Sequence, residues 1–321
     1  MIEVLSTAAL TTVQDLGRYG QRRYGVGTAG AMDRLALTLG NEMLGNDPNA
    51  AGLEITLTPF KIRFLRETSF AVAGADFDAS LDGTQLLPWW ATTAKEGQEL
   101  MLKRPVHGAR AYLCIAGGID VPPVLGSRST QMRGAIGGYE GRQLRRGDVL
   151  TVNDCPLRRG NFGIIPPEHR LAPGSASGSV TVRAIPAGEY EKFTEASCKQ
   201  LWTTPWQITP QSNRTGYRLQ GQKLELTQPL EMRSHGIIPG VVQVPPSGQP
   251  VVQLADANVS GGYPKIATVI SADLWRLAQA RIGEHISFVQ VDVEEALSAS
   301  RAIDEYIKEV RRATALAMPW R

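Results

Sequence analysis

The chain has 321 residues, of which 42% are hydrophobic and 20% charged, and its formal net charge is +3. This length exceeds that of most single-core domains, so we expect two domains or one large β domain. No basic segment alternates with aromatic residues, which argues against a nucleic-acid partner. No apolar run is long enough to span a bilayer, and the first residues do not resemble a signal peptide. We therefore expect a cytoplasmic protein without a membrane partner.

Short apolar runs dominate the chain. They are rich in β-branched residues, as in "LEITL", "KIRFL", "FAVAGA", "AYLCIAGG", "VTVRAI", "VVQLAD" and "KIATVIS". The 33 glycines and 20 prolines punctuate these runs at turn positions. This spacing predicts a mainly antiparallel β protein with a few peripheral helices.

Three segments depart from the strand pattern. Residues 30–45 place apolar residues at helical spacing and end at a glycine, and residues 188–202 form a second helical pattern. The third helix is predicted for residues 292–315, where Asp292 as N-cap precedes Glu295 by three positions, as in a capping box. Its predicted apolar stripe consists of Val293, Leu297, Ile303, Ile307 and Val310.

A stretch rich in proline, glycine and serine divides the chain. Residues 156–180 lack periodicity and are predicted to link an N-terminal β-rich lobe, residues 1–155 with the helix 30–45 inserted, to a C-terminal lobe, residues 181–321. The segment "TVQDLGRYGQRRYG" resembles "TPQSNRTGYRLQG" in the second half, and each precedes a similar apolar run. An ancient duplication would give two similar β-barrel lobes; chance similarity of turn-prone residues is the alternative.

Motifs for common cofactor sites are absent or incomplete. The chain has no GxxxxGK[ST] phosphate loop and no GxSxG nucleophile elbow. The segment "GVGTAG", residues 25–30, has dinucleotide-loop spacing but does not follow a buried strand. The three cysteines and four histidines are widely separated, so we expect neither a disulfide framework nor a metal site.

Polar side chains gather in the second half of the chain. Arg214, close to several turn residues, is suited to bidentate recognition of a carboxylate or phosphate, although an exposed hairpin tip would have the same composition. Gln243 and Gln253 alternate with valines on predicted strands. Either one alone would be expected to face solvent, but two of them near His235 and Asp256 favour a lined pocket.

The segment from Asp256 to Lys265 is the strongest candidate for a catalytic site. Asp256 ends a predicted strand and could accept a proton or orient a cation, and Lys265 begins the next strand and could stabilise negative charge. Gly261 and Gly262 tolerate positive φ and could expose main-chain N–H groups, and Tyr263 could wall the pocket. A hairpin with an exposed lysine is the alternative, and the chemistry alone does not decide between them.

Many motifs, in order from about residue 3 to residue 300, resemble one family. They include "TTVQDLGRYGQRRYGV", "GAMD", "GNEMLGND", "AYLCIAGGIDVPPVLGSRST", "GGYEGRQLRRGD", "SNRTGYRLQG", "SHGIIPGVVQVPPSGQP" and "GGYPKIATVISADL". The family is the KipA-like family, also called allophanate hydrolase subunit 2 or biotin-dependent carboxyltransferase-like. Within it, the bacterial 5-oxoprolinase members are the most similar.

This resemblance implies a cyclophilin-like β-barrel fold and a subunit of an ATP-dependent 5-oxoprolinase, which opens 5-oxo-L-proline to L-glutamate. The implied partners are the KipI-like B subunit of 5-oxoprolinase and its A subunit, with ATP and Mg²⁺ used by the complex. Other relatives imply two alternatives: a carboxyltransferase component of a biotin-dependent urea or amide carboxylase, or a non-enzymatic regulator that binds a KipI-like protein. Biotin is not expected, because no "MKM"-type carrier sequence occurs.

The resemblance also carries candidate residues over to this chain. Those expected to be catalytic are Arg214, His235, Asp256 and Lys265. Those expected to bind substrate are Asp15, Arg18, Asp33, Tyr217, Gln243, Gly261, Gly262 and Tyr263, together with Gln253 from the strand pattern. The chain departs from the family at Asn258, Val259 and Ser260, where a glutamine and two threonines are usual, so part of the hydrogen bonding expected from those threonines is lost.

Overall fold

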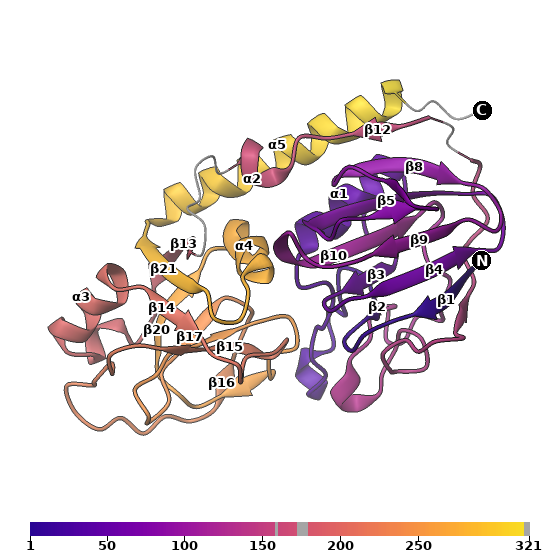
Figure 1. The fold of residues 1–321 in the computed structure, drawn as a ribbon. Coiled ribbons are helices and arrows are strands. Elements are labelled where there is room, and N and C mark those ends of the chain that lie inside the picture. The colour runs from indigo at the N-terminus through magenta and orange to yellow at the C-terminus, as the bar shows by residue number, and fades with distance from the viewer. Residues whose placement is uncertain (158–159, 172–178, 318–321) are drawn as a thin grey trace. The chain divides into compact units, whose positions relative to one another are not determined.

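The computed structural model describes residues 1–157, 160–171 and 179–317 (Figure 1). The chain divides into two compact units. Unit 1 comprises Met1–Tyr19, Ala29–Arg170 and Asp304–Arg321, and unit 2 comprises Gly20–Thr28 and Leu171–Ile303. Each unit is mainly β, which confirms the predicted fold class. No helix in the described ranges is long and apolar enough to cross a membrane.

Unit 1 contains two six-stranded sheets. The first has the order β11 (Val149–Leu150), β1 (Ile2–Ser6), β4 (Phe60–Phe64), β9 (Glu99–Leu102), β6 (Ser80–Leu81) and β7 (Thr84–Gln85). The second has the order β12 (Phe162–Gly163), β8 (Trp90–Ala94), β5 (Thr68–Asp76), β10 (His107–Ile115), β3 (Gly52–Ile55) and β2 (Thr12–Gln14). All the strand pairs recorded within these sheets are antiparallel.

The core of unit 1 lies between its two sheets. Ile62 and Leu100 of the first sheet and Leu53 and Leu113 of the second belong to one fully buried cluster. Helix α1 (Arg34–Leu44) packs on β5 and β10, close enough that a Cβ on Gly40 would lie 2.7 Å from Cys114 Sγ. Any larger residue at position 40 would therefore separate the helix from the sheet.

Unit 2 is a closed seven-stranded barrel with a two-stranded sheet beside it. The barrel order is β13 (Ser179–Pro186), β20 (Lys265–Val269), β17 (Val241–Gln243), β18 (Val251–Gln253), β15 (Gly216–Gln220), β14 (Trp206–Ile208) and β21 (His285–Gln290). Strand β13 closes the barrel by pairing in parallel with β21. The small sheet joins β16 (His235–Gly236) to β19 (Ser260–Gly261).

The short helices connect these strands. The 3₁₀ turns are η1 (Arg22–Tyr24), η2 (Met132–Gly134), η3 (Tyr190–Lys192) and η4 (Ser271–Asp273), and the short α-helices are α2 (Pro167–Arg170), α3 (Glu195–Thr203) and α4 (Leu274–Gln279). The helix predicted for residues 188–202 is therefore two elements, η3 and α3. The Thr194 hydroxyl accepts from the Ser197 N–H and caps α3, so the new helix starts there.

The terminal helix α5 (Val293–Ala317) buries only part of the predicted stripe: Val310 is buried and Ile303 packs against a buried cluster, whereas its first two members are exposed. Val293 and Leu297 are 62% and 51% exposed, and the buried residues are Ala299, Tyr306, Val310 and Thr314. The prediction gave weight to large apolar residues, but the face that packs is set by Ala299 and by the Tyr306 hydroxyl, which donates to the Ile165 carbonyl.

The main passage from unit 1 to unit 2, after Arg170, lies within the predicted linker of residues 156–180. Two segments depart from the predicted lobes: Gly20–Thr28 belongs to unit 2, and α5 is divided, with its residues from Asp304 onward belonging to unit 1. There, Arg311 binds the buried Glu42 of α1. The second copy of the proposed repeat contains β15, but the apolar run after it, "LELTQPLEMRS", forms no strand like β3 and β4: Leu226 makes only an isolated bridge, and unit 1 has sheets where unit 2 has a closed barrel.

Candidate functional site

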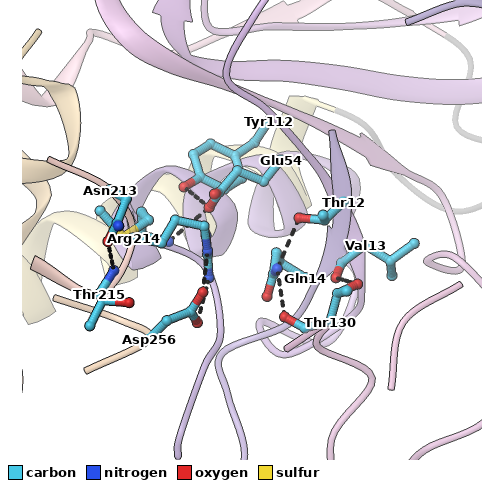
Figure 2. Close-up of polar contacts among 11 residues, drawn as sticks. Thr12, Val13, Gln14, Glu54, Tyr112, Thr130, Asn213, Arg214, Thr215 and Asp256 are labelled. Atoms are coloured by element: carbon cyan, nitrogen blue, oxygen red, sulfur yellow. Dashed lines mark hydrogen bonds and ion pairs between the residues drawn. The ribbon is translucent and has the colours of Figure 1, made fainter. Parts of the chain in front are cut away.

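An ion pair between Arg214 and Asp256 lies beside strands β15 and β18. Arg214 Nε and Nη2 donate to the two oxygens of Asp256 at 2.8 Å and 3.2 Å (Figure 2). The side chains are 9% and 16% exposed. A bidentate pair with this little solvent fixes the guanidinium plane, which a single surface contact would not do.

Local backbone pairing produces this ion pair. Gly216 lies opposite Gln253 in the β15–β18 ladder, and the ladder continues outward through hydrogen bonds from Leu254 N–H to Thr215 O and from Asp256 N–H to Arg214 O. The Asn213 side chain accepts from Thr215 N–H and tightens the turn (Figure 2). The residues that sequence reasoning treated as an exposed hairpin tip or a cleft are thus an ordered extension of the barrel wall.

Two buried glutamines form a hydrogen-bonded ladder in unit 2. Gln253 Nε2 donates to Gln243 Oε1 at 3.1 Å, and Gln243 Nε2 donates to the Tyr263 carbonyl at 3.2 Å. Gln243 is 4% exposed and Gln253 is 8% exposed, so both amides lie within the protein. We refer to Gln253, Gln243 and the Tyr263 carbonyl as the amide ladder.

Lys265 lies level with Gln243 in the β17–β20 register. Its main-chain N–H donates to Glu189 Oε2 at 3.0 Å, so a carboxylate from the turn after β13 fixes the first residue of β20. Its side chain is half-buried, and its ammonium makes no ion pair with any residue in the described ranges. Asp256 lies beyond the opposite end of β18 and binds Arg214, so the structure does not pair Asp256 with Lys265.

Gly261 and Gly262 are required for space and not for an unusual backbone angle. Neither has a positive φ. A Cβ on Gly261 would lie 2.5 Å from Ile237 Cδ1 and 3.2 Å from Gln243 Nε2, and one on Gly262 would lie 3.0 Å from the Met232 carbonyl. The tolerance of glycine for positive φ is therefore not used here; the absence of a Cβ lets β19 and the residue after it pack closely on their neighbours.

His235 lies opposite Gly261 in the small sheet. Its Nδ1 lies 3.0 Å from the Arg233 carbonyl, which requires the proton on Nδ1. Its Nε2 is buried and has no hydrogen-bond partner among the described residues. In the neutral ring, Nε2 is then the nitrogen that carries the lone pair.

The two candidate tyrosines, Tyr217 and Tyr263, differ in their exposure to solvent. Tyr217 is 3% exposed, and its hydroxyl donates to the Ala280 carbonyl at 3.1 Å, so it braces the barrel from within. Tyr263 is 48% exposed, and its main-chain carbonyl accepts from the amide ladder. Only Tyr263 therefore offers its ring to a ligand or partner from the surface.

The segment that departs from the family pattern is held by its main chain. The Val259 carbonyl accepts from Ile237 N–H and from Arg22 Nη2, each at 3.1 Å, and Ser260 pairs with Gly236. Arg22 comes from the segment Gly20–Thr28, which belongs to unit 2 although it lies early in the sequence. Since these hydrogen bonds use backbone atoms of the segment, they are compatible with other side chains there.

In unit 1, Asp15 is the centre of a buried hydrogen-bond node. Its side chain is 2% exposed, and one oxygen accepts from Gly17 N–H, Ser127 Oγ and Ser129 Oγ at 2.8, 2.7 and 2.5 Å. The other accepts from Arg128 N–H at 2.6 Å. We refer to these contacts as the Asp15 node. It ties the segment after β2 to the loop after β10.

The same loop is held by a buried arginine and by strand β2. Arg18 is completely buried and donates to the carbonyls of Val124 and Ser129, each at 2.9 Å. Next to it, the Thr130 hydroxyl donates to the Val13 carbonyl, and Gln14 Nε2 donates to Thr12 Oγ1 and to the Thr130 carbonyl (Figure 2). The structure thus places Asp15 and Arg18 in contacts that shape the loop.

Asp33 caps helix α1. Its carboxylate accepts from Ala36 N–H at 2.8 Å, and its own N–H donates to the Tyr112 hydroxyl at 2.7 Å. That hydroxyl donates to Glu54 (Figure 2), which also accepts from Met32 N–H. Burial, followed by the nearby Glu54 and Asp33 carboxylates, raises the pKa of Tyr112 well above its usual range.

Sequence reasoning missed several residues of these networks. The missed residues are Glu54, Tyr112, Ser127, Ser129 and Glu189. A signal for Glu54 did exist, since a glutamate inside the apolar run "LEITL" needs hydrogen-bond partners if it is buried. No local signal connects Glu189 to Lys265, because the two are 76 residues apart.

The site in unit 2 combines the half-buried Lys265, the His235 imidazole and hydrogen-bonding amides. These groups can bind a small polar ligand, stabilise negative charge and accept a proton. In the described ranges, no three His, Cys, Asp or Glu side chains are placed to hold a metal ion.

Known proteins resemble the whole chain. A family model described as the carboxyltransferase domain, subdomain A and B, matches residues 24–290. The C subunit of 5-oxoprolinase from Escherichia coli (strain K12) is 45% identical over 313 residues, which is 97% of this chain and 97% of that protein. The protein of the same name from Haemophilus influenzae is 43% identical over 97% of this chain and 98% of its own length.

A solved structure has the same fold. The crystal structure of the Kluyveromyces lactis urea amidolyase matches 96% of this chain with a TM-score of 0.88 and 32% identity, and the match covers 20% of that longer chain. These similarities confirm the family that the sequence motifs indicated. The chain belongs to the family of the carboxyltransferase domain, subdomain A and B.

Proposed function

We propose that this chain is a subunit of an ATP-dependent 5-oxoprolinase complex that opens 5-oxo-L-proline to L-glutamate. The observation that carries the proposal is the similarity over 97% of the chain to proteins named as the C subunit of 5-oxoprolinase. The polar groups of the unit 2 barrel support it, because they suit a small anionic amide. The proposed partners are the KipI-like B subunit of 5-oxoprolinase and its A subunit, in the cytoplasm, and ATP with Mg²⁺ is used by the assembled complex.

The proposed reaction overcomes the resonance stabilisation of the lactam. The amide oxygen takes the γ-phosphoryl group of ATP and releases ADP. A first water adds to the amide carbon, and the C–N bond breaks as the nitrogen takes a proton. A second water hydrolyses the resulting acyl phosphate to the glutamate side chain and phosphate. Every stage places negative charge on oxygen, which nearby cations stabilise.

Each candidate residue has a role in this scheme. Lys265 stabilises the developing charge, since the residue is half-buried and its ammonium makes no ion pair with a described residue. His235 accepts a proton through Nε2. Asp256 holds the Arg214 guanidinium in position. Of the two roles expected for Asp256, this is the orientation of a cation, and the cation is Arg214.

Reconstitution with the A and B subunits tests the proposal. We expect Lys265→Ala to lower oxoproline-dependent ADP release by about 100-fold, as the loss of one charge-stabilising donor usually does. Lys223→Ala is the matched control, because Lys223 is an exposed lysine of the same unit. Release of ADP at the wild-type rate by Lys265→Ala would remove Lys265 from the site. A wild-type complex without oxoproline-dependent ADP release would overturn the function itself.

A second candidate is the carboxyltransferase component of a biotin-dependent urea or amide carboxylase. The description of the matching family and the similarity to urea amidolyase favour it. The two candidates differ in their need for biotin. Turnover of 5-oxoproline by a biotin-free complex excludes the second, whereas transfer of a carboxyl group from carboxybiotin to urea would establish it.

A further inference from the structure

The polarity of the amide ladder is determined by its fixed end. A main-chain carbonyl can only accept hydrogen bonds, so the end of Gln243 that faces the Tyr263 carbonyl must be its NH₂ group. Gln243 therefore presents its oxygen to Gln253, and Gln253 must present its own NH₂ group in return. This order does not depend on how the two amides are assigned, because reversing either one would bring two acceptors together.

The open end of the ladder is consequently an acceptor. Gln253 Oε1 receives no hydrogen bond from any residue in the described ranges. This oxygen is not fully buried, so it keeps some contact with solvent, although the residue as a whole is only 8% exposed. A nearly buried glutamine with a fixed, accessible oxygen can accept one hydrogen bond from a ligand.

The backbone holds this oxygen in a defined place. Gln253 ends β18 opposite Gly216, and its main-chain carbonyl accepts from Gly240 N–H at 2.8 Å. Asp256, which binds Arg214, lies three residues after Gln253 in the chain. The amide oxygen and the guanidinium therefore belong to adjacent, rigid parts of one barrel wall.

We propose that Gln253 Oε1 accepts the N–H of the substrate amide and so selects a lactam over ring analogues that lack an N–H. This inference rests on the proposed function. The lactam nitrogen of 5-oxoproline carries one hydrogen, and after the C–N bond breaks the amine remains a donor, so the contact persists through the reaction. A lactone of the same ring places an oxygen there, and two acceptors then face each other. Sites that hydrogen-bond a substrate N–H discriminate strongly against analogues that lack it.

The first test compares two ligands in the reconstituted complex. The lactone analogue is 5-oxotetrahydrofuran-2-carboxylate, used as an inhibitor of oxoproline-dependent ADP release. We expect wild type to bind it at least about 30-fold more weakly than 5-oxoproline. Gln253→Met keeps the length of the side chain but has no strong acceptor. It should lower kcat/KM for 5-oxoproline by about 10-fold or more and leave the lactone inhibition constant within about threefold. The proposal would be overturned if Gln253→Met weakened 5-oxoproline turnover and lactone inhibition by the same factor, or changed neither of them.

The second test examines the polarity without any substrate, and so separates the inference from the proposed function. Gln253→Glu places a carboxylate next to Gln243 Oε1, and an ionised carboxylate cannot donate. We expect the melting temperature of Gln253→Glu to lie below that of Gln253→Met at pH 8, and the gap to shrink toward pH 5 as the introduced carboxyl group gains a proton that it can donate. Equal melting temperatures at pH 8 would show that the polarity is wrong, whether or not the complex hydrolyses 5-oxoproline.

Discussion

The Asp15 node of unit 1 and the amide ladder of unit 2 are both buried polar networks, but they end differently. Both oxygens of Asp15 accept hydrogen bonds from the protein, four in all. The ladder, by contrast, ends in Gln253 Oε1, to which no described residue donates. A carboxylate that is fully used by its own chain shapes the fold, whereas an amide chain with an open end can bind something else.

The comparison separates two pairs of residues for which the sequence predicted the same role. Asp15 and Arg18 were expected to bind substrate, as were Gln243 and Gln253. The structure gives the first two main-chain and serine partners in their own unit, and it gives Gln253 an accessible oxygen. If the comparison is sound, substitutions in the node should act mainly on stability and substitutions in the ladder on both stability and catalysis.

The largest effect is expected for Asp15→Ala. It leaves two serine hydroxyls and two main-chain N–H groups without their acceptor, and we expect a loss of about 4 kcal/mol in the free energy of unfolding. Chemical denaturation followed by fluorescence measures it. Asp120→Ala, at an exposed aspartate of the same unit, should change stability by less than about 0.5 kcal/mol. A stable Asp15→Ala protein that had lost only activity would contradict the comparison.

An intermediate effect is expected for Gly138→Ala in the loop that the Asp15 node holds. Gly138 has a φ of +58°, and its new Cβ would lie 1.8 Å from Thr130 Oγ1, which bonds the Val13 carbonyl. Gly126→Ala is the matched control, since its φ is +81° but nothing lies within 4 Å of its Cβ. We expect about 1 kcal/mol from backbone strain in the control and about 2 to 3 kcal/mol for Gly138→Ala. Similar melting temperatures for the two variants would show that the loop yields without cost.

The smallest stability effect is expected for Gln243→Leu. The substitution removes the donor to the Tyr263 carbonyl and the acceptor for Gln253, at a cost of about 1 to 2 kcal/mol. It also frees Gln253 to rotate, so kcat/KM in the reconstituted complex should fall by more than the stability loss would suggest. Gln220→Leu, an exposed glutamine of the same barrel, is the control for both measurements. Full activity in Gln243→Leu would mean that the ladder does not orient Gln253.

The fold class was accessible from sequence because it depends on local patterns. Short apolar runs rich in β-branched residues, separated by glycines and prolines, predicted the β architecture, and apolar residues at helical spacing predicted the helix that became α1 (Arg34–Leu44). The burial of α5 was not accessible in the same way. Its packed face depends on Ala299 and Tyr306, and no periodicity of large apolar residues marks them.

The residue types of the site were also predicted, but not their partners. Hydrogen bonds such as the one from Lys265 N–H to Glu189 join residues that are far apart in the chain. The glycines at 261 and 262 were singled out for their tolerance of positive φ, whereas the structure shows that neighbouring atoms leave no room for a Cβ there. Close approach between strands and a positive φ both demand glycine, and only coordinates distinguish them.

The division of the chain between the units has a consequence for its biosynthesis. The polypeptide crosses from one unit to the other after Tyr19, Thr28, Arg170 and Ile303. Both segments of unit 2 thus lie between segments of unit 1 in the sequence. The last segment of unit 1 leaves the ribosome after all of unit 2 has been synthesised. Until then, Glu42 of α1 lacks Arg311. No single cut can release either unit intact, and a nascent chain that has finished unit 2 still carries an unfinished unit 1.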